Sequence, residues 1–269
     1  MLATPLLSHA TGSRTIIQIV AATLLMLGGA TSSKWAQSAI LQVTPVRVEF
    51  DNSQRAQALN IVNSGSSDLD AQVRVMRWTQ ENGQERLVPA DDMVVSPAIV
   101  RVSPGKQQIV RLVRMQPTPP AKELSYRVFV DELPSTSTSE TGAGLKVLMR
   151  YSIPVFVAPL EAGAPAKSDK VPAASSTDLS SVHSQFVAGN DGLGVLRVRN
   201  DGLRALRISY LSTLGAGGER RMLGNGLIGY VLPGQQMSWP VNLPYPLPAG
   251  LIVKARFNED RQARPLPMD

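Results

Sequence analysis

The most constraining feature of this sequence is the regular alternation of short apolar–polar segments with turn residues. Residues 46–50 read VRVEF and residues 71–78 read AQVRVMRW, and apolar side chains alternate with polar ones through Val46, Val48 and Phe50 in the first segment and through Val73 and Val75 in the second. Such a period of two places the apolar side chains on one face of a β-strand. Tight turns are indicated at Asn82-Gly83 and Pro104-Gly105. Because Pro and Gly recur about every ten residues, helices are disfavoured and an all-β fold is predicted.

The strand pattern is dense enough for a sandwich in the first part of the chain. Further alternating segments occupy residues 109–114, 125–133 and 144–157. Roughly seven strands in about 120 residues is the pattern of an immunoglobulin-like β-sandwich.

A second group of strands follows a break in the pattern. We assign residues 39–160 to an N-terminal immunoglobulin-like domain and residues 161–180, rich in Ala, Pro, Ser and Lys, to a linker. Residues 181–269 resume the alternation in LGVLRVRN, ALRISYL and LIVKARF, and are assigned to a C-terminal β-sandwich. The predicted fold class is therefore two tandem immunoglobulin-like β-sandwiches.

The first residues have the layout of a secretory signal. Arg14 precedes TIIQIVAATLLMLGGA, an uncharged apolar run that is followed by small residues. A membrane anchor is the alternative, but about 16 apolar residues are fewer than the ~20 that a spanning helix needs. We predict a signal peptide at 1–38, export of the chain, and no membrane insertion of the mature protein.

Charge and composition exclude several classes of function. The chain has a net charge of +6, and removal of Arg14 and Lys34 with the signal would leave +4. The basic residues are spread along the strands and are not interleaved with aromatic residues, which argues against nucleic-acid binding. The absence of cysteine excludes disulfides, thiolate metal sites and a cysteine nucleophile.

Catalytic and metal-binding patterns are also missing. His183 is the single histidine of the predicted mature chain, and a site needs several converging groups. The acid doublets Asp91-Asp92 and Glu259-Asp260 are adjacent on the chain, so their side chains point to opposite faces of a strand. No phosphate-binding loop or nucleophile elbow is present. We therefore predict no enzymatic activity, no cofactor and no metal site.

Several ordered motifs of the first domain are similar to those of one protein family. They resemble the periplasmic chaperones of the chaperone–usher pathway, the PapD-like pilus-assembly chaperones, and the RYSIPVFV ending resembles the archaic branch. The similarity covers the first domain almost end to end and is weaker in the second domain. The motifs are LQVTPVRVEFDNSQRAQALNIVNSG, SPAIVRVSPGKQQIVRLVR, SYRVFVDELP and LKVLMRYSIPVFVAP, followed by VRNDGLRALRIS and GYVLPGQ.

The resemblance implies a location, a shape and a mechanism. It implies a periplasmic protein whose two domains form an L with a cleft between them. Its partners would be pilin subunits, which are immunoglobulin-like folds lacking their last strand, and the outer-membrane usher. The chaperone would lend a strand to the subunit, a form of β-strand addition, and would self-associate when free. The residues assigned to the lent strand are Leu145, Val147 and Met149 at the family's donor positions, with Tyr151 and Ile153 extending the row.

The resemblance also implies an anchor for the C-terminal carboxylate of the subunit. Arg47 matches the family's cleft arginine, and a guanidinium can meet a carboxylate with two parallel hydrogen bonds. The alternation predicts Arg47 on the face opposite Val46 and Val48. The family's second cation, a lysine, corresponds to Pro154 here, and Arg150 on the same strand is the weaker substitute.

A salt bridge between the two domains is a further property of the family. Glu123 and Asp260 match its two acids, whereas the position of its arginine is occupied by Ala158. The resemblance therefore implies inter-domain roles for both acids without the basic residue that joins them.

Two other readings remain open at the level of sequence. The first is a secreted tandem β-sandwich that binds glycans or a surface protein through its loop tips, as an adhesin module does. Glycan sites usually expose aromatic side chains, and the predicted mature chain contains only Trp78 and Trp239 as tryptophans. The second is a β-sandwich hydrolase, which the missing catalytic groups disfavour.

Overall fold

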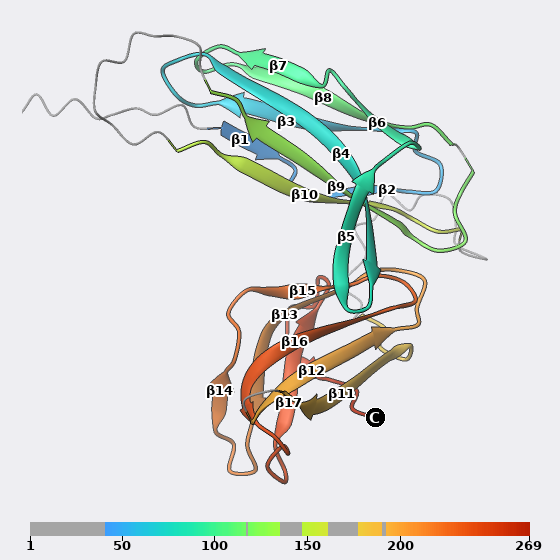
Figure 1. Ribbon diagram of the computed structural model, residues 1–269, viewed down its shortest axis with the longest axis vertical. Coiled ribbons are helices and arrows are strands. Elements are labelled where there is room, and N and C mark those ends of the chain that lie inside the picture. Colours follow the sequence, from blue (N-terminus) through green and yellow to red (C-terminus); the bar gives the residue numbers. More distant parts are fainter. Residues whose placement is uncertain (1–40, 117, 135–146, 161–176, 190–191) are drawn as a thin grey trace, which may run out of the picture. The chain divides into compact units, whose positions relative to one another are not determined.

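The computed structural model describes residues 41–116, 118–134, 147–160, 177–189 and 192–269 of the chain (Figure 1). The regular structure in these ranges consists of strands, which confirms the predicted all-β class. The predicted signal peptide, Leu145 and most of the predicted linker lie outside the described residues. Within those ranges, no helix has the length and apolar character that a membrane crossing would require.

The first sandwich packs two sheets face to face. One sheet has the order β1-β3-β8-β6, and the other has the order β2-β10-β9-β4-β5 with β7 paired to β4. Their bounds are β1 Leu41–Thr44, β3 Ala56–Asn63, β8 Gln107–Arg114, β6 Met93–Ser96, β2 Val48–Phe50, β10 Arg150–Val157, β9 Leu124–Glu132, β4 Leu69–Glu81, β5 Gln84–Pro89 and β7 Ile99–Val102.

The second sandwich has the same two-layer construction. One sheet has the order β11-β12-β16, and the other has the order β14-β13-β17-β18 with β15 paired to β13 (Figure 1). Their bounds are β11 Val182–Ala188, β12 Leu193–Asn200, β16 Gln235–Pro244, β14 Arg220–Met222, β13 Leu206–Leu214, β17 Ile252–Phe257, β18 Arg264–Pro265 and β15 Leu227–Val231.

The sequence alternation explains each core. On β8, Val110 and Leu112 are buried while Ile109 and Arg111 are exposed, so one face of the strand enters the core. Val128 and Val130 of β9 belong to the same core from the opposite sheet. Burial of each such side chain contributes about 1.5–3 kcal/mol, which is what holds the two layers together.

Turn chemistry sets the connections. Asn82 and Gly83 have φ angles of 54° and 76°, and they join β4 to β5 where the Asn-Gly pair predicted a tight turn. Gly105, with φ of 68°, occupies the predicted turn before β8. These left-handed conformations are costly for most residues and suit Gly and Asn, so the turns fix where the strands end.

One predicted strand is shorter than expected. β2 begins at Val48, and Val46 is 69% exposed. The prediction that Val46 and Val48 share the core face is therefore wrong for Val46, because the chain becomes extended only after that residue. β2 then pairs in parallel with the end of β10, with Val48 opposite Val155.

Candidate functional site

The last strand of the first sandwich is paired unequally along its two edges. One edge of β10 pairs with β9 over its whole length, from Arg150 opposite Asp131 to Val157 opposite Leu124. The other edge pairs with β2 only over Val155–Val157. Among the described residues, no strand pairs with the second edge over Arg150–Pro154, so this part of the edge is open to another strand.

An exposed apolar segment leads into this open edge. Val147 is 62% exposed, and Leu148 and Met149 are each 42% exposed. The segment is tied to the end of β9, because the Glu132 N–H donates to the Met149 carbonyl at 2.9 Å. The chain is thus already held beside β9 while three consecutive apolar side chains face solvent.

Two members of the predicted donor row are turned toward their own domain. Ile153 is buried in the core of the first sandwich, and the half-buried Tyr151 packs against that core. The Tyr151 hydroxyl also donates to the Leu41 carbonyl at 2.8 Å. The prediction that Tyr151 and Ile153 present their side chains to a partner is therefore wrong, because β10 has already entered the sandwich at these positions. The row retained as a proposal is Leu145, Val147 and Met149, of which Leu145 lies outside the described residues.

Arg47 lies beside β2 and is held by several groups. Its Nη2 is 2.6 Å from Glu49 Oε1, and its Nη1 is 3.8 Å from Glu259 Oε1. Its Cζ lies 4.9 Å from the centre of the Phe156 ring. Nε and Nη1 are buried and have no hydrogen-bond partner. The guanidinium is therefore held in place while its Nε and Nη1 donors form no hydrogen bond.

Arg150, the weaker anchor candidate, pairs with a residue of its own sheet. It forms an ion pair with Asp131, which also receives hydrogen bonds from Arg74. Burial alone would raise the pKa of Asp131, but the hydrogen bonds from Arg74 and then Arg150 lower it. Arg150 therefore shares the single carboxylate of Asp131 with Arg74 and is held in its own sheet.

Glu123 reaches the second sandwich through its backbone and its carboxyl group. Its N–H donates to the Leu203 carbonyl at 2.9 Å, and its Oε1 accepts from the Ala205 N–H at 2.9 Å. Burial raises the pKa of Glu123 to about 7, although the hydrogen bond from Ala205 opposes the change. Glu123 thus joins the two sandwiches through backbone groups of the second sandwich, and the charges of Arg204 and Arg47 also lower its pKa.

The other predicted inter-domain acid behaves differently. Asp260 accepts hydrogen bonds from the N–H and hydroxyl of Thr177 at 2.8 and 3.0 Å, and it lies 3.6 Å from Arg264. Thr177 lies shortly before β11 and Arg264 lies on β18, so these contacts stay on the side of the second sandwich and the inter-domain contact predicted for Asp260 is wrong. Its neighbour Glu259 extends toward Arg47 instead, since adjacent side chains leave the chain in different directions.

The contact between the sandwiches has an aromatic centre that the sequence patterns did not reveal. We call it the seam, and it consists of Trp78, Phe156, Ala205, Tyr230 and Leu232. The Trp78 and Tyr230 rings meet edge to face, with centroids 5.4 Å apart, and Arg127 Cζ lies 3.8 Å from the Trp78 ring centre. Such aromatic pairs stabilise beyond their buried area alone.

Gln80 joins the two sandwiches beside the seam. Its side-chain Nε2 donates to the Tyr230 carbonyl at 2.9 Å, and its Oε1 accepts from the Leu232 N–H at 2.9 Å. The amide is buried, so both bonds are protected from water. A glutamine two residues after Trp78, at the same parity of the strand alternation, was the only signal in the sequence.

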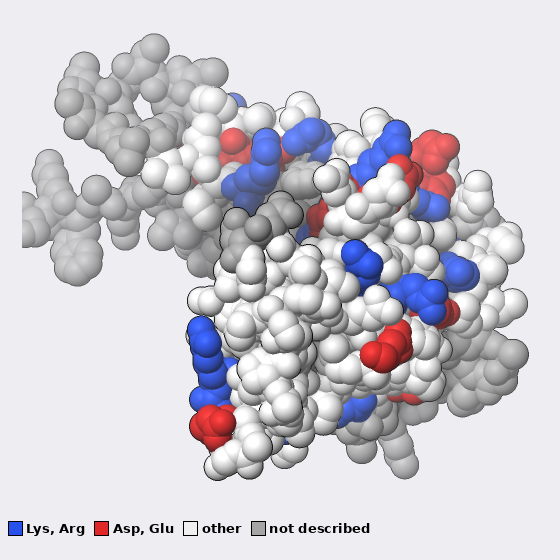
Figure 2. Space-filling view, turned by 60° about the horizontal axis from the view of Figure 1, so that its bottom comes forward, with Lys and Arg blue, Asp and Glu red and all other residues white. Residues whose placement is uncertain are grey.

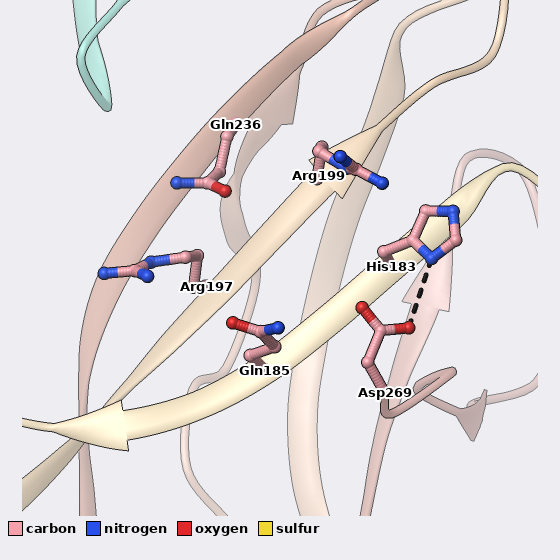
Figure 3. Close-up of a pocket in the computed structure, with 6 residues that line it drawn as sticks. All are labelled: His183, Gln185, Arg197, Arg199, Gln236 and Asp269. Atoms are coloured by element: carbon pink, nitrogen blue, oxygen red, sulfur yellow. Dashed lines mark hydrogen bonds and ion pairs between the residues drawn. The ribbon is translucent and has the colours of Figure 1, made fainter.

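A polar pocket lies on the outer face of the sheet β11-β12-β16 (Figure 3). His183 Nδ1 is 3.1 Å from Asp269 Oδ1, and Arg199 lies 2.9 Å from Asp201. His183 and Arg199 of this pocket are thus paired with carboxylates, whereas the buried Nε of Arg197 has no hydrogen-bond partner. In the described part of the chain, no three His, Asp or Glu side chains are grouped so as to hold a metal ion.

Basic side chains do not gather into a continuous patch on the face shown in Figure 2, where they lie among acidic and uncharged groups. Several are paired on the surface, such as Arg101 with Asp70 at 2.7 Å and Arg86 with Glu81 at 2.8 Å. This face therefore lacks the basic track that a nucleic-acid backbone would require.

Comparison with known proteins places this geometry in a class. Residues 40–162 match the family described as pili and flagellar-assembly chaperone, PapD N-terminal domain. This match lies over the first sandwich, which is less than half of the chain, and the motifs of that sandwich resemble the same family. A curated relative, the probable fimbrial chaperone LpfB of Escherichia coli O157:H7, is 25% identical over 119 residues. That match covers 44% of this chain and 49% of the relative, so it spans about half the length of each.

Solved structures share the whole two-domain fold. The CsuC–CsuE chaperone–tip adhesion subunit pre-assembly complex from archaic chaperone-usher Csu pili of Acinetobacter baumannii matches with a TM-score of 0.63 and 24% identity. The match covers 86% of this chain and 98% of that one. The E. coli chaperone DraB matches with a TM-score of 0.55, 20% identity, and coverage of 86% and 97%. The Salmonella enterica SafA pilin in complex with the SafB chaperone matches with a TM-score of 0.55, 16% identity, and coverage of 86% and 96%. The fold is thus that of two immunoglobulin-like β-sandwiches, as in these chaperones.

Replacement of Gln80 by alanine should weaken the junction of the sandwiches. The change leaves the Tyr230 carbonyl and the Leu232 N–H buried without partners, at a cost of about 1–3 kcal/mol. Urea unfolding should show a lower midpoint or a separate early transition. Replacement of the exposed Gln84 by alanine is the matched control and should have no effect. Equal stability of the two variants would contradict a structural role for the buried amide.

Glu123 should make stability depend on pH. Its pKa is raised from 4.5 to about 7, so the folded state binds a proton that the unfolded state has released over this window. Stability should therefore fall as pH rises from about 4.5 to about 7, by on the order of 3 kcal/mol, and then level off. Urea unfolding at pH 5 and pH 8 measures the fall, which Glu123→Gln should largely remove and the exposed-site control Glu81→Gln should keep. An unchanged pH dependence in Glu123→Gln would show that other groups cause it.

Proposed function

We propose that this chain is a periplasmic chaperone that binds pilus subunits by strand donation and delivers them to an outer-membrane usher. The observation that carries the proposal is the open edge of β10 over Arg150–Pro154, preceded by the exposed Val147–Met149 segment. The match of residues 40–162 to the PapD N-terminal domain family supports it. The predicted signal peptide supports the periplasmic location.

The chemistry of this edge suits a partner that lacks a strand. The unpaired backbone groups would complete the partner's hydrogen-bond ladder, while alternate side chains would fill its groove. Burial of Val147 and Met149 would each contribute about 1.5–3 kcal/mol, and Leu145 would add a similar amount. Association entropy and side-chain ordering offset much of this gain, which suits a carrier that must later release its subunit. Because the chaperone contributes binding groups and no reaction, the proposed function is non-enzymatic.

Arg47 would anchor the C-terminal carboxylate of the subunit. Its unused donors and fixed position support this role, since a guanidinium held in place loses little entropy on binding a carboxylate. A subunit anchored at this point would be placed in register along β10.

The alternative of a glycan-binding module receives less support. Trp78 is buried in the seam, and Trp239 packs against the core of the second sandwich. Neither tryptophan therefore offers the open aromatic face on which a sugar ring could stack.

Met149→Asp should abolish co-purification of a pilin from the periplasm while the chaperone still folds. A buried carboxylate in the subunit's groove would be strongly unfavourable, whereas an exposed one costs the free protein little. Leu148→Asp is the matched control, because Leu148 has the same exposed fraction but the opposite position in the alternation. Pull-down with mass spectrometry, together with circular dichroism, measures both properties. If both variants lost the pilin, or neither did, alternate-side-chain donation would be excluded.

Arg47→Ala should weaken subunit capture at least tenfold and change the free energy of unfolding by about 1 kcal/mol or less, since its ion pairs are partly exposed. Arg150→Ala should leave capture nearly unchanged because Asp131 already engages that charge. Titration of each variant with purified subunit measures the affinity, and thermal unfolding measures the stability of both variants. A large loss of stability in Arg47→Ala with normal capture would identify Arg47 as a structural residue.

A further inference from the structure

The carboxylate of Glu259 lies between two arginines that come from different sandwiches. Its Oε1 is 3.8 Å from Arg47 Nη1 and 3.2 Å from Arg207 Nη2. Arg47 lies beside β2 of the first sandwich, and Arg207 lies on β13 of the second. Two guanidinium groups therefore converge on a single carboxylate oxygen.

Both guanidiniums keep buried donors that the protein does not use. Nε and Nη1 of Arg47, and Nε of Arg207, are buried and have no hydrogen-bond partner. Buried N–H groups without partners are rare because each costs free energy. Arg207 is also fixed in place, since its Nη2 donates to the Asn258 carbonyl and its backbone N–H donates to Asn258 Oδ1 at 2.8 Å. The two guanidinium groups are thus held in place with more N–H donors than Glu259 satisfies.

Glu259 itself is held weakly. Its side chain is 78% exposed and lies in the turn that follows β17, next to Asn258 with a φ of 45°. Exposed ion pairs of this kind contribute little and are easily exchanged. Glu49 remains paired with Arg47 at 2.6 Å, and the buried Glu123 also acts electrostatically on Arg47. With Glu259 turned away, the two arginines and Glu49 would leave one positive charge for an incoming anion.

We propose that Arg47 and Arg207 form one carboxylate-binding site in which Glu259 is an exchangeable internal occupant. Resting on the proposed function, the incoming ligand is the C-terminal carboxylate of the bound subunit, which displaces Glu259. Arg207 would then supply, from the second sandwich, the second positive charge that Pro154 cannot supply on β10. A subunit would be gripped by both sandwiches at once.

Acetate titration of the purified protein, followed by NMR of the arginine Nε–Hε signals, tests the site without a subunit. Acetate should shift the signals of both Arg47 and Arg207, and acetamide at the same ionic strength should shift neither. Glu259→Gln should lower the half-saturating acetate concentration about threefold by removing the competing charge. Arg207→Ala should raise it about tenfold, while replacement of the exposed Arg221 by alanine should leave it unchanged.

A response of Arg47 alone, or an equal half-saturation in Glu259→Gln and the unchanged protein, would overturn the proposal. Glu259→Gln keeps the size of the side chain, so the test stands even where Arg207→Ala fails to fold. Failure of the proposed function has a different signature: normal pilin capture by Met149→Asp would exclude strand donation while the acetate response persisted. Loss of the acetate response with the Met149 and Leu148 results intact would exclude the two-arginine site alone.

Discussion

The structure depends on how β10 satisfies its backbone. β9 provides hydrogen bonds along one edge, which fixes the strand in the sandwich, whereas β2 covers only Val155–Val157 of the other edge. A strand cannot leave polar groups unpaired in an apolar setting, so the uncovered part must face either water or another strand. The apolar Val147–Met149 segment beside it makes water the less favourable neighbour. An added strand at this edge would give its unpaired backbone groups hydrogen-bond partners.

The second sandwich packs against β10 and so holds the strand that carries this edge in place. Trp78 and Phe156 of the first sandwich pack on Tyr230 of the second, and Gln80 bonds to the backbone on both sides of Val231. Phe156 belongs to β10 itself and also lies under Arg47. Strand β10, the guanidinium of Arg47 and the contact between the sandwiches therefore all depend on Phe156, and a change at this residue would act on all three.

The sequence predicted those features that depend on local alternation and turns, and it missed those that depend on distant neighbours. The sandwich strands and the Asn82-Gly83 turn follow from side-chain parity and φ preferences. The same parity could not tell Met149 from Ile153, because only the position at which β10 enters its own core separates them. Gln80 and Tyr230 are 150 positions apart, and no periodicity reports such a pair. The inter-domain role was predicted for Asp260, but the acid that reaches Arg47 of the first sandwich is its neighbour Glu259, in the turn after β17. A shift of one residue in a turn is not visible in the sequence alternation.

The two hydrogen bonds that Gln80 forms with the backbone at Tyr230 and Leu232 have an evolutionary consequence. Main-chain N–H and carbonyl groups are the same for every amino acid except proline, which lacks the N–H, so this joint places little demand on the side chains that it touches. The two halves of the molecule can diverge in sequence at that point while their attachment is preserved. One glutamine thereby allows the surface of either half to change independently of the other.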